Sequence, residues 1–254
     1  MLTNEEIVAL FKPYVAINEH QLADIKMYVS ELKAWNSKAN LTSLETDEDI
    51  YTSHFLDSFT ILQYIKNSQS MLLDVGTGGG FPGYAIKLVF SHIKLTLLDS
   101  SSKKIVFLNH MKELFRMQNV TTIWGRAEEA AQMPEYREKY DFVTSRAVAD
   151  MTILSELCIP FVKIGGLFIA QKGRSEEEIK TATPAIEFLG GKIEDIKKVK
   201  LPGDDADRQI VLIRKIKATS PDFPRKSGVP NKKPLKVEKL GAFIFQDKKA
   251  NFEE

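Results

Sequence analysis

The 254-residue sequence is poor in cysteine and histidine and contains no long apolar run. Cys158 is the only cysteine, which excludes an internal disulfide, and four scattered histidines without a second cysteine give no structural zinc pattern. The N-terminus MLTNEEIVALF carries acids where a signal peptide needs positive charge, and no apolar stretch approaches the roughly 18 residues of a membrane span. We therefore expect a cytoplasmic protein with no metal and no membrane contact.

The net charge of +1 is distributed unevenly along the chain. Residues 214–239 hold nine Lys or Arg and two acids, whereas everything before residue 214 holds 24 basic and 29 acidic residues. After residue 217 prolines and basic residues replace periodic apolar positions, so we expect a flexible tail that does not fold alone. A flexible basic strand can neutralise nucleic-acid phosphates, and a merely solubilising tail is the alternative.

Near residue 67 the sequence pattern changes from helical segments alone to an alternation of strand-like and helix-like segments. Residues 3–67 have apolar positions three and four apart, which predicts helices, and from Met71 onward strand-like and helix-like segments alternate. The expected strands are 71–75, 93–98, 120–124, 141–144, 167–171, 192–201 and 209–216. Only a turn separates the last two, which predicts an α/β fold with a mostly parallel seven-stranded sheet and an antiparallel last strand. We divide the chain into an N-terminal helical region (1–67), a cofactor-binding domain (68–217) and a basic tail (218–254).

Two polar-aromatic islands interrupt the N-terminal helices. The first is Trp35-Asn36 followed by 40–43, and the second is HFLDS at 54–58. We interpret both as capping and core packing, with Thr46 or Asp47 starting a helix and Trp35 filling space against the sheet. A lid over a cofactor, or a surface for substrate, is the alternative.

The glycine-rich stretch MLLDVGTGGGFPG, at 71–83, predicts a buried strand that turns tightly into a helix. Glycines let the backbone approach a nucleotide-like cofactor closely, and the helix start offers free N–H groups. The pattern G-x-G-x-x-G of dinucleotide sites is present, but the better register is D-x-G-x-G-x-G at Asp74, Gly76, Gly78 and Gly80. The acid suits a cationic ligand and would repel a pyrophosphate. This register resembles motif I of Rossmann-like methyltransferases, which bind S-adenosylmethionine; a nicotinamide or flavin site, or a structural turn, is the alternative.

Further candidates lie just after the expected strands, because ligands of an open α/β sheet bind at the carboxyl ends of its strands. Asp99 can accept both ribose hydroxyls, or it can cap the next helix. Ala127 and Glu128 can read adenine, or Glu128 can simply favour the helix dipole. Arg146 can bind the cofactor carboxylate or a substrate base, or it can merely pair with an acid such as Asp150.

The residues after the fourth expected strand narrow the chemistry. The sequence TSRAVA lacks the Asn/Asp-Pro-Pro-aromatic turn expected for methylation of an exocyclic amine, and Cys158 lies in the apolar helix SELCIPFV, where we expect a buried thiol rather than a nucleophile. No hydrolytic triad can be assembled. The remaining possibility is transfer to an atom that is already nucleophilic, such as guanine N7, which needs alignment and no general base. We therefore predict no catalytic side chain, with Arg146 as the candidate substrate contact.

Together these motifs resemble the bacterial 16S rRNA guanine-N7 methyltransferases of the glucose-inhibited division protein B family. The shared elements are WN and NLTS (35–43), HFLDS (54–58), DVGTGGGFPG (74–83), LLDSSSKKIVFL (97–108), GRAEE (125–129), SRAVA (145–149) and PRKSGVPNKKPL (224–235). The resemblance implies a cytoplasmic enzyme with a Rossmann-like class I methyltransferase fold that methylates a guanine in the decoding-region loop of 16S rRNA, as naked RNA or in the small ribosomal subunit. It implies S-adenosylmethionine contacts at Gly76, Phe81, Ala127, Glu128 and Arg146, to which the reasoning from the residues adds Gly78 and Asp99.

Other interpretations of the sequence stay open at this point. Phe81 can be a core residue at the turn, and residues 236–254 have no counterpart in the resemblance. The chain can be a methyltransferase of the same fold that acts on another RNA, a small molecule or a protein. It can also be a nicotinamide-dependent oxidoreductase or a non-catalytic binder of ribosomal RNA. Asp74 and the closing hairpin disfavour the oxidoreductase.

Overall fold

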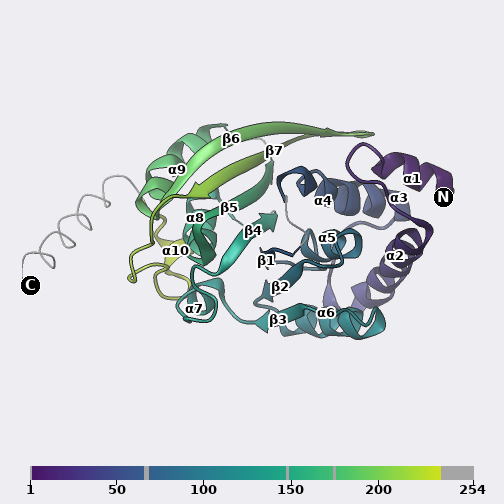
Figure 1. The fold of residues 1–254 in the computed structure, drawn as a ribbon, viewed down its shortest axis with the longest axis horizontal. Coiled ribbons are helices and arrows are strands. Elements are labelled where there is room, and N and C mark those ends of the chain that lie inside the picture. The colour runs from purple at the N-terminus through teal and green to yellow at the C-terminus, as the bar shows by residue number, and fades with distance from the viewer. Residues whose placement is uncertain (1, 66–68, 147–148, 174–175, 236–254) are drawn as a thin grey trace, which may run out of the picture.

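The structure, a computed structural model, describes residues 2–65, 69–146, 149–173 and 176–235, apart from the side chains of 204–206 (Figure 1). Its strands are β1 (Met71–Val75), β2 (Lys94–Asp99), β3 (Val120–Trp124), β4 (Tyr140–Arg146), β5 (Val162–Gly173), β6 (Gly191–Leu201) and β7 (Asp204–Lys215). Its longer helices are α1 (Asn4–Phe11), α2 (Glu19–Ala39), α5 (Gly83–Val89), α6 (Ser102–Leu114), α8 (Met151–Cys158) and α9 (Glu176–Phe188). The short helical elements are α3 (Asp47–Asp49), η1 (Ile50–Leu56), α4 (Asp57–Phe59), η2 (Leu62–Tyr64), α7 (Ala127–Ala130), η3 (Ile159–Phe161) and α10 (Val229–Lys232).

The seven strands form one sheet in the order β3-β2-β1-β4-β5-β7-β6. Strands β1 to β5 pair in parallel, whereas β7 is antiparallel to both β5 and β6. The predicted fold class is therefore confirmed, including the antiparallel last strand. Strand β5 extends beyond its expected range at both ends and β7 begins earlier than expected, because ladder hydrogen bonds continue past the apolar runs on which the expectation rested.

Alternating strand residues supply the two hydrophobic cores, because successive side chains point to opposite faces of a sheet. Leu72 and Leu97 belong to the core beneath α1, α2, α5 and α6, whereas Leu73 and Leu98 belong to the core beneath α8 and α9. Figure 1 shows α1 to α6 on one side of the sheet and α7 to α10 on the other. In the described ranges, no helix is long and apolar enough to cross a membrane.

The N-terminal helices begin where the sequence predicts. Thr46 caps α3, as expected, since its side chain accepts from the backbone N–H of Asp49. Trp35 on α2 packs against Phe107 and stacks on His110 of α6, which confirms its packing role. These helices share one apolar cluster with α5 and α6. The division of the chain at residues 67 and 217 stays a prediction.

The segment 218–235 differs from the expected flexible tail. It packs against the α8 and α9 side of the sheet, where Phe223 and Leu235 are buried in the core. The expectation was wrong for these residues because it treated the segment as an isolated chain, whereas two apolar anchors and a buried ion pair hold it to the body. Arg225 forms that pair with Glu156, a fully buried residue. The rest of the expected tail, 236–254, lies outside the described residues.

Candidate functional site

The cleft of interest lies where the strand order changes direction. From β1 the chain first adds β2 and β3 on one side and later β4 and β5 on the other, which opens a crevice at the carboxyl ends of β1 and β4. Two pockets of about 680 and about 210 Å³ occupy this edge. They adjoin each other, since Gly76, Asp99 and Ser100 line both.

The structure brings all seven candidate residues from the sequence to this cleft. Gly76, Gly78, Phe81, Asp99 and Arg146 line the larger pocket, and Gly76, Asp99, Ala127 and Glu128 line the smaller one. Their contact with a cofactor stays a prediction. The elements that carry them, β1, β2, β3 and β4, are neighbours in the sheet and end at the same edge.

The glycine loop after β1 has a backbone that glycine alone adopts readily. Gly78 and Gly80 have φ angles of +60° and +91°, and a Cβ on Gly80 would lie 2.2 Å from the Tyr28 hydroxyl oxygen. The loop is tied to β2 because Asp99 Oδ2 accepts from the N–H of Gly78 at 2.9 Å. The other oxygen of Asp99 accepts from Ser101 N–H, and Ser101 itself is the cap of α6. Asp99 thus braces the loop and keeps further lone pairs for a ligand.

Asp74 is placed differently from the expectation that it faces a cationic ligand. Its carboxylate is fully buried and lines neither pocket; Oδ2 accepts from the Thr77 hydroxyl and from Gly83 N–H. Oδ1 has no hydrogen-bond partner among the residues described. Burial raises the pKa of Asp74 to about 6. Its influence on a ligand is therefore exerted through the loop that it holds and through its charge.

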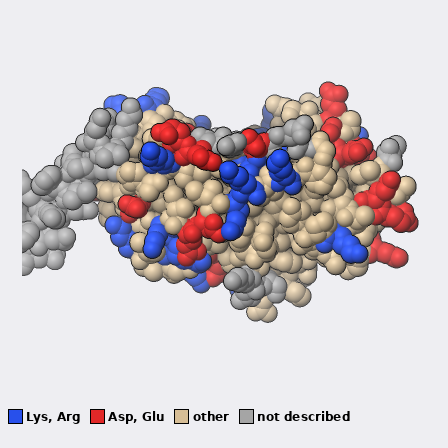
Figure 2. All heavy atoms as spheres, turned by 90° about the horizontal axis from the view of Figure 1, so that it is seen from above, with Lys and Arg blue, Asp and Glu red and all other residues tan. Residues whose placement is uncertain are grey.

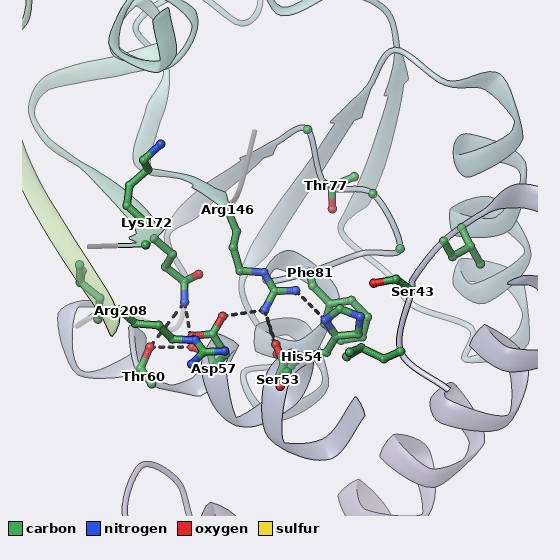
Figure 3. A pocket seen from close by; sticks show the side chains of 18 of the residues that line it. Ser43, Ser53, His54, Asp57, Thr60, Thr77, Phe81, Arg146, Lys172 and Arg208 are labelled. Carbon is green, nitrogen blue, oxygen red and sulfur yellow. Dashed lines mark hydrogen bonds and ion pairs between the residues drawn. The ribbon is translucent and has the colours of Figure 1, made fainter. Parts of the chain in front are cut away.

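Arg146, at the end of β4, crosses to the N-terminal helices (Figure 3). Its Nη1 donates to Asp57 Oδ2 at 2.9 Å and to the carbonyl oxygens of Ser53 and His54. Its Nη2 donates to His54 Nδ1 at 3.1 Å. The alternative that it pairs with an acid is confirmed, but the acid is Asp57; Asp150, the example given, caps α8 instead. A guanidinium has five N–H donors, so the Nε–H and one Nη2–H remain for a ligand.

His54 is held as a neutral hydrogen-bond acceptor. Burial first, and then the charge of Arg146, lower the pKa of His54 to about 3. Because Arg146 donates to Nδ1, the ring proton lies on Nε2, which meets the Thr42 hydroxyl at 2.7 Å. The ring stacks on Phe81 with centroids 4.6 Å apart, and Figure 3 shows the two rings overlying each other. His54 shapes the pocket wall and has no lone pair left for taking a proton.

The second polar-aromatic island therefore belongs to the site rather than only to the core. His54 and Asp57 line the larger pocket, and the wider π-helical turn η1 presents the carbonyl oxygens that receive Arg146. The interpretation of this island as capping and core packing was incomplete. The types of its side chains do not show that one face of the helical turn meets Arg146 at the end of β4. π-helical turns occur frequently at functional sites, so this turn would have marked the site. The sequence pattern, however, does not reveal where such a turn forms.

Cations line the mouth of the larger pocket. Lys104, Lys172 and Arg208 contribute to its lining, and Arg208 Nε lies 3.5 Å from Asp57 Oδ1. Figure 2 shows Lys and Arg gathered along the middle of one face of the molecule, while the end formed by the N-terminal helices is mostly acidic. Such a surface favours an anionic partner at the pocket.

The smaller pocket has a wall that sequence reasoning missed. Asn231 of α10 lines it together with Ala127 and Glu128, and Glu128 Oε1 accepts from the N–H of Gly228 at 2.9 Å. The basic segment thus reaches the cofactor cleft. Asn231 falls within the shared element 224–235, but the expectation of a flexible tail gave no reason to place it at this cleft.

Comparisons with known proteins identify relatives of this chain. A family model described as rRNA small subunit methyltransferase G matches residues 21–211. The chain is 47% identical over 221 residues to the ribosomal RNA small subunit methyltransferase G of Acetivibrio thermocellus, covering 87% of this chain and 91% of that protein. The Bacillus subtilis protein of the same name is 44% identical over 223 residues, covering 87% and 93% of the two chains.

Solved structures with the same fold are distant in sequence. The [4+2]-cyclase SpnF superposes with a TM-score of 0.55 at 11% identity, covering 78% of this chain and 96% of that one. Pyrococcus horikoshii TYW2 in complex with MeSAdo superposes with a TM-score of 0.50 at 12% identity, covering 67% and 64%. These likenesses establish the fold and nothing about substrate.

Proposed function

The chain belongs to the rRNA small subunit methyltransferase G family, and from this premise we propose that it transfers a methyl group from S-adenosylmethionine to N7 of a guanine in the decoding-region loop of 16S ribosomal RNA. The observation that carries the proposal is the cleft at the switch point, where a glycine loop, two acids and one arginine converge. Its partner is the 16S RNA itself or the small ribosomal subunit.

The residues of the cleft fit an adenosyl sulfonium ligand. Gly78 and Gly80 leave the loop without side chains in its positive-φ turn, and the buried Asp99 carboxylate retains lone pairs for ribose hydroxyls. Glu128 Oε1 accepts from Gly228 N–H, the only hydrogen bond that its carboxylate receives within the described ranges, so Oε2 is left for a base amine. When bound, the cofactor supplies a methyl group activated by the positive sulfur.

The residues on the substrate side orient the reacting groups and exchange no protons with them. Arg146 keeps two N–H donors for the cofactor carboxylate or the guanine, while Asp57 and the carbonyl oxygens of Ser53 and His54 fix its orientation. His54 stays neutral and is stacked on Phe81. Guanine N7 carries a lone pair and no proton, so forming the N–C bond and breaking the C–S bond releases no proton. The arrangement suits a reaction that needs alignment and exclusion of water alone.

Of the cations that line the larger pocket, Lys104 suits the phosphates of an RNA loop, whereas Lys172 and Arg208 are already paired with Glu178 and Asp57. Sequence-specific RNA readers favour splayed single-stranded bases, and the open pocket of about 680 Å³ can admit one beside the cofactor.

The test is to incubate the protein with tritiated methyl donor and small ribosomal subunits, or naked 16S RNA, from a strain that lacks the modification. We expect label at N7 of one guanine in the decoding-region loop. Label on a carbon or an exocyclic amine would contradict the proposed chemistry. Calorimetry that detects no binding of S-adenosylhomocysteine at millimolar concentration would contradict the cofactor.

A further inference from the structure

The segment 218–235 is fastened to the body by a buried ion pair. Arg225 donates through Nε and Nη2 to the two carboxylate oxygens of Glu156, at 2.8 and 2.6 Å, and its backbone N–H donates to the same carboxylate. Glu156 lies on α8 and is fully buried. A bidentate pair of this kind fixes direction as well as position, so Arg225 sets the path of the residues after it.

A second set of contacts fixes the start of the segment. Arg137 donates to the backbone carbonyl oxygens of Thr219, Ser220 and Phe223, at 2.9, 3.0 and 2.8 Å. The Phe223 ring is buried and meets Phe188 edge-on with centroids 5.2 Å apart. Because one side chain satisfies three carbonyls, the backbone conformation here is determined by the body and not by the segment alone.

Beyond Arg225 the segment reaches the end of the cleft that holds the adenine-reading candidates. Gly228 N–H donates to Glu128 Oε1 at 2.9 Å, and the Ser227 hydroxyl donates to Glu129 Oε1 at 3.0 Å. Gly228 has a φ of +80° and starts the short helix α10. This turn brings Asn231 into the lining of the smaller pocket, together with Asp99 and Ala127.

The charged side chains of the segment also indicate a structural role at the cleft. Arg225 forms an ion pair with Glu156. Lys215, which lies just before the segment, is buried and forms an ion pair with Glu138. Neither cation is therefore available to RNA phosphates. Lys226, Lys232 and Lys233 are exposed. The anchored part of the basic segment therefore has a structural role at the cofactor cleft, while its exposed lysines face solvent.

We propose that residues 225–231 form a wall of the cofactor site and that Asn231 contacts the adenine ring, which makes it a residue that determines specificity for the adenosyl group. The inference rests on the proposed function. An asparagine amide offers one acceptor and two donors, which match the amine and ring nitrogens along an adenine edge. Among the described residues the Asn231 side chain has no hydrogen-bond partner, so its amide is available to the ligand.

The experiment compares Asn231→Ala with Lys232→Ala, a matched control from the next position of α10 that lines neither pocket. Calorimetry measures the Kd of S-adenosylhomocysteine and of S-inosylhomocysteine, which carries an oxygen in place of the adenine amine. We expect Asn231→Ala to weaken S-adenosylhomocysteine by about threefold to tenfold, the effect of one or two hydrogen bonds. Its preference for the adenosyl over the inosyl compound should shrink, while Lys232→Ala leaves both constants and the preference unchanged.

A second arm tests the wall itself. Hydrogen exchange of the full chain should show protection of the amides of residues 226–231 when S-adenosylhomocysteine is added. Arg225→Ala should reduce that protection and weaken binding, whereas Lys226→Ala, which removes an exposed neighbour, should do neither.

The outcomes separate the inference from the proposed function. Wild-type protein that fails to bind S-adenosylhomocysteine overturns the proposed function. If the wild type binds normally, the role of Asn231 is overturned by any of three results. Asn231→Ala binds S-adenosylhomocysteine as tightly as wild type, or Asn231→Ala and Lys232→Ala weaken binding equally, or Asn231→Ala keeps the full preference for the adenosyl compound. Absence of ligand-induced protection in 226–231 overturns the wall.

Discussion

The two pockets of the cleft are built in different ways. The smaller one is formed mainly by residues at or just after the ends of neighbouring parallel strands, such as Asp99 and Glu128, and these two acids accept hydrogen bonds. The larger one joins the end of β4 to the helices before the sheet, and its centre is a cation held by Asp57 and His54. One end is suited to reading a nucleoside, and the other to holding an anionic substrate in a fixed direction.

The difference between the pockets predicts that substitutions separate binding from turnover. Changes in the smaller pocket should appear first in the Kd of S-adenosylhomocysteine, and changes in the larger pocket should appear first in the rate of methyl transfer.

Arg146→Ala should have the largest effect and should act on turnover. Removing a preorganised donor from an active site costs about 10²–10³ in kcat, and here the loss also removes the 2.9 Å ion pair of Asp57, whose contact with Arg208 is longer at 3.5 Å. Single-turnover transfer to small ribosomal subunits measures the rate, and calorimetry measures cofactor binding. The matched control is Arg214→Ala on β7, whose partner Glu194 is exposed, so its pair contributes about 0–1 kcal/mol. A wild-type rate in Arg146→Ala would show that the arginine is only structural.

Asp99→Ala should come second and should act on cofactor binding. Losing one or two hydrogen bonds to a charged group costs roughly 1.5–3 kcal/mol each, which weakens S-adenosylhomocysteine by at least about tenfold. Asp99→Asn keeps an oxygen for Gly78 N–H, so it should retain part of the affinity and separate bracing of the loop from contact with ribose. Calorimetry on both variants, with Glu194→Ala as a surface control, decides the matter. Unchanged affinity in Asp99→Ala would remove it from the cofactor site.

His54→Asn should have a modest effect, with transfer within about tenfold of wild type, because the amide oxygen can replace Nδ1 as an acceptor for Arg146. Since burial and Arg146 lower the pKa of His54 to about 3, the ring is neutral on the whole range from pH 6 to pH 8. Single-turnover rates at saturating cofactor should therefore have the same pH profile across that range in both proteins. A rise near pH 6.5 that disappears in the variant would show that His54 takes a proton, and the contrast between the pockets would fail.

The sequence predicted the residues near the strand ends in both pockets, but it missed the residues that distant segments bring to them. Candidates such as Asp99 and Glu128 follow expected strands, so the rule that ligands bind at strand ends found them without tertiary information. Asp57 lies in a helical island whose pattern is equally typical of packing, and only the approach of β4 brings it to Arg146. The tail was mispredicted for the same reason: its low local hydrophobicity gave no sign that Glu156 and Arg137 of the body bind it.

The smallest expected effect concerns Asp74, which influences both pockets without lining either. Because burial raises its pKa to about 6, the carboxyl is charged above that pH and becomes neutral as the pH falls through it. A buried negative charge at the loop favours a positive sulfonium over the neutral sulfur of S-adenosylhomocysteine, and we expect this preference to be a few-fold in affinity. We expect the ratio of the two affinities to fall a few-fold from pH 7.5 to pH 5 in wild type and to stay constant in Asp74→Asn. Taking the ratio cancels any common effect of pH on the amino-acid and adenosyl ends, so a ratio that is equally flat in wild type would show that the acid serves only to hold Thr77 and Gly83.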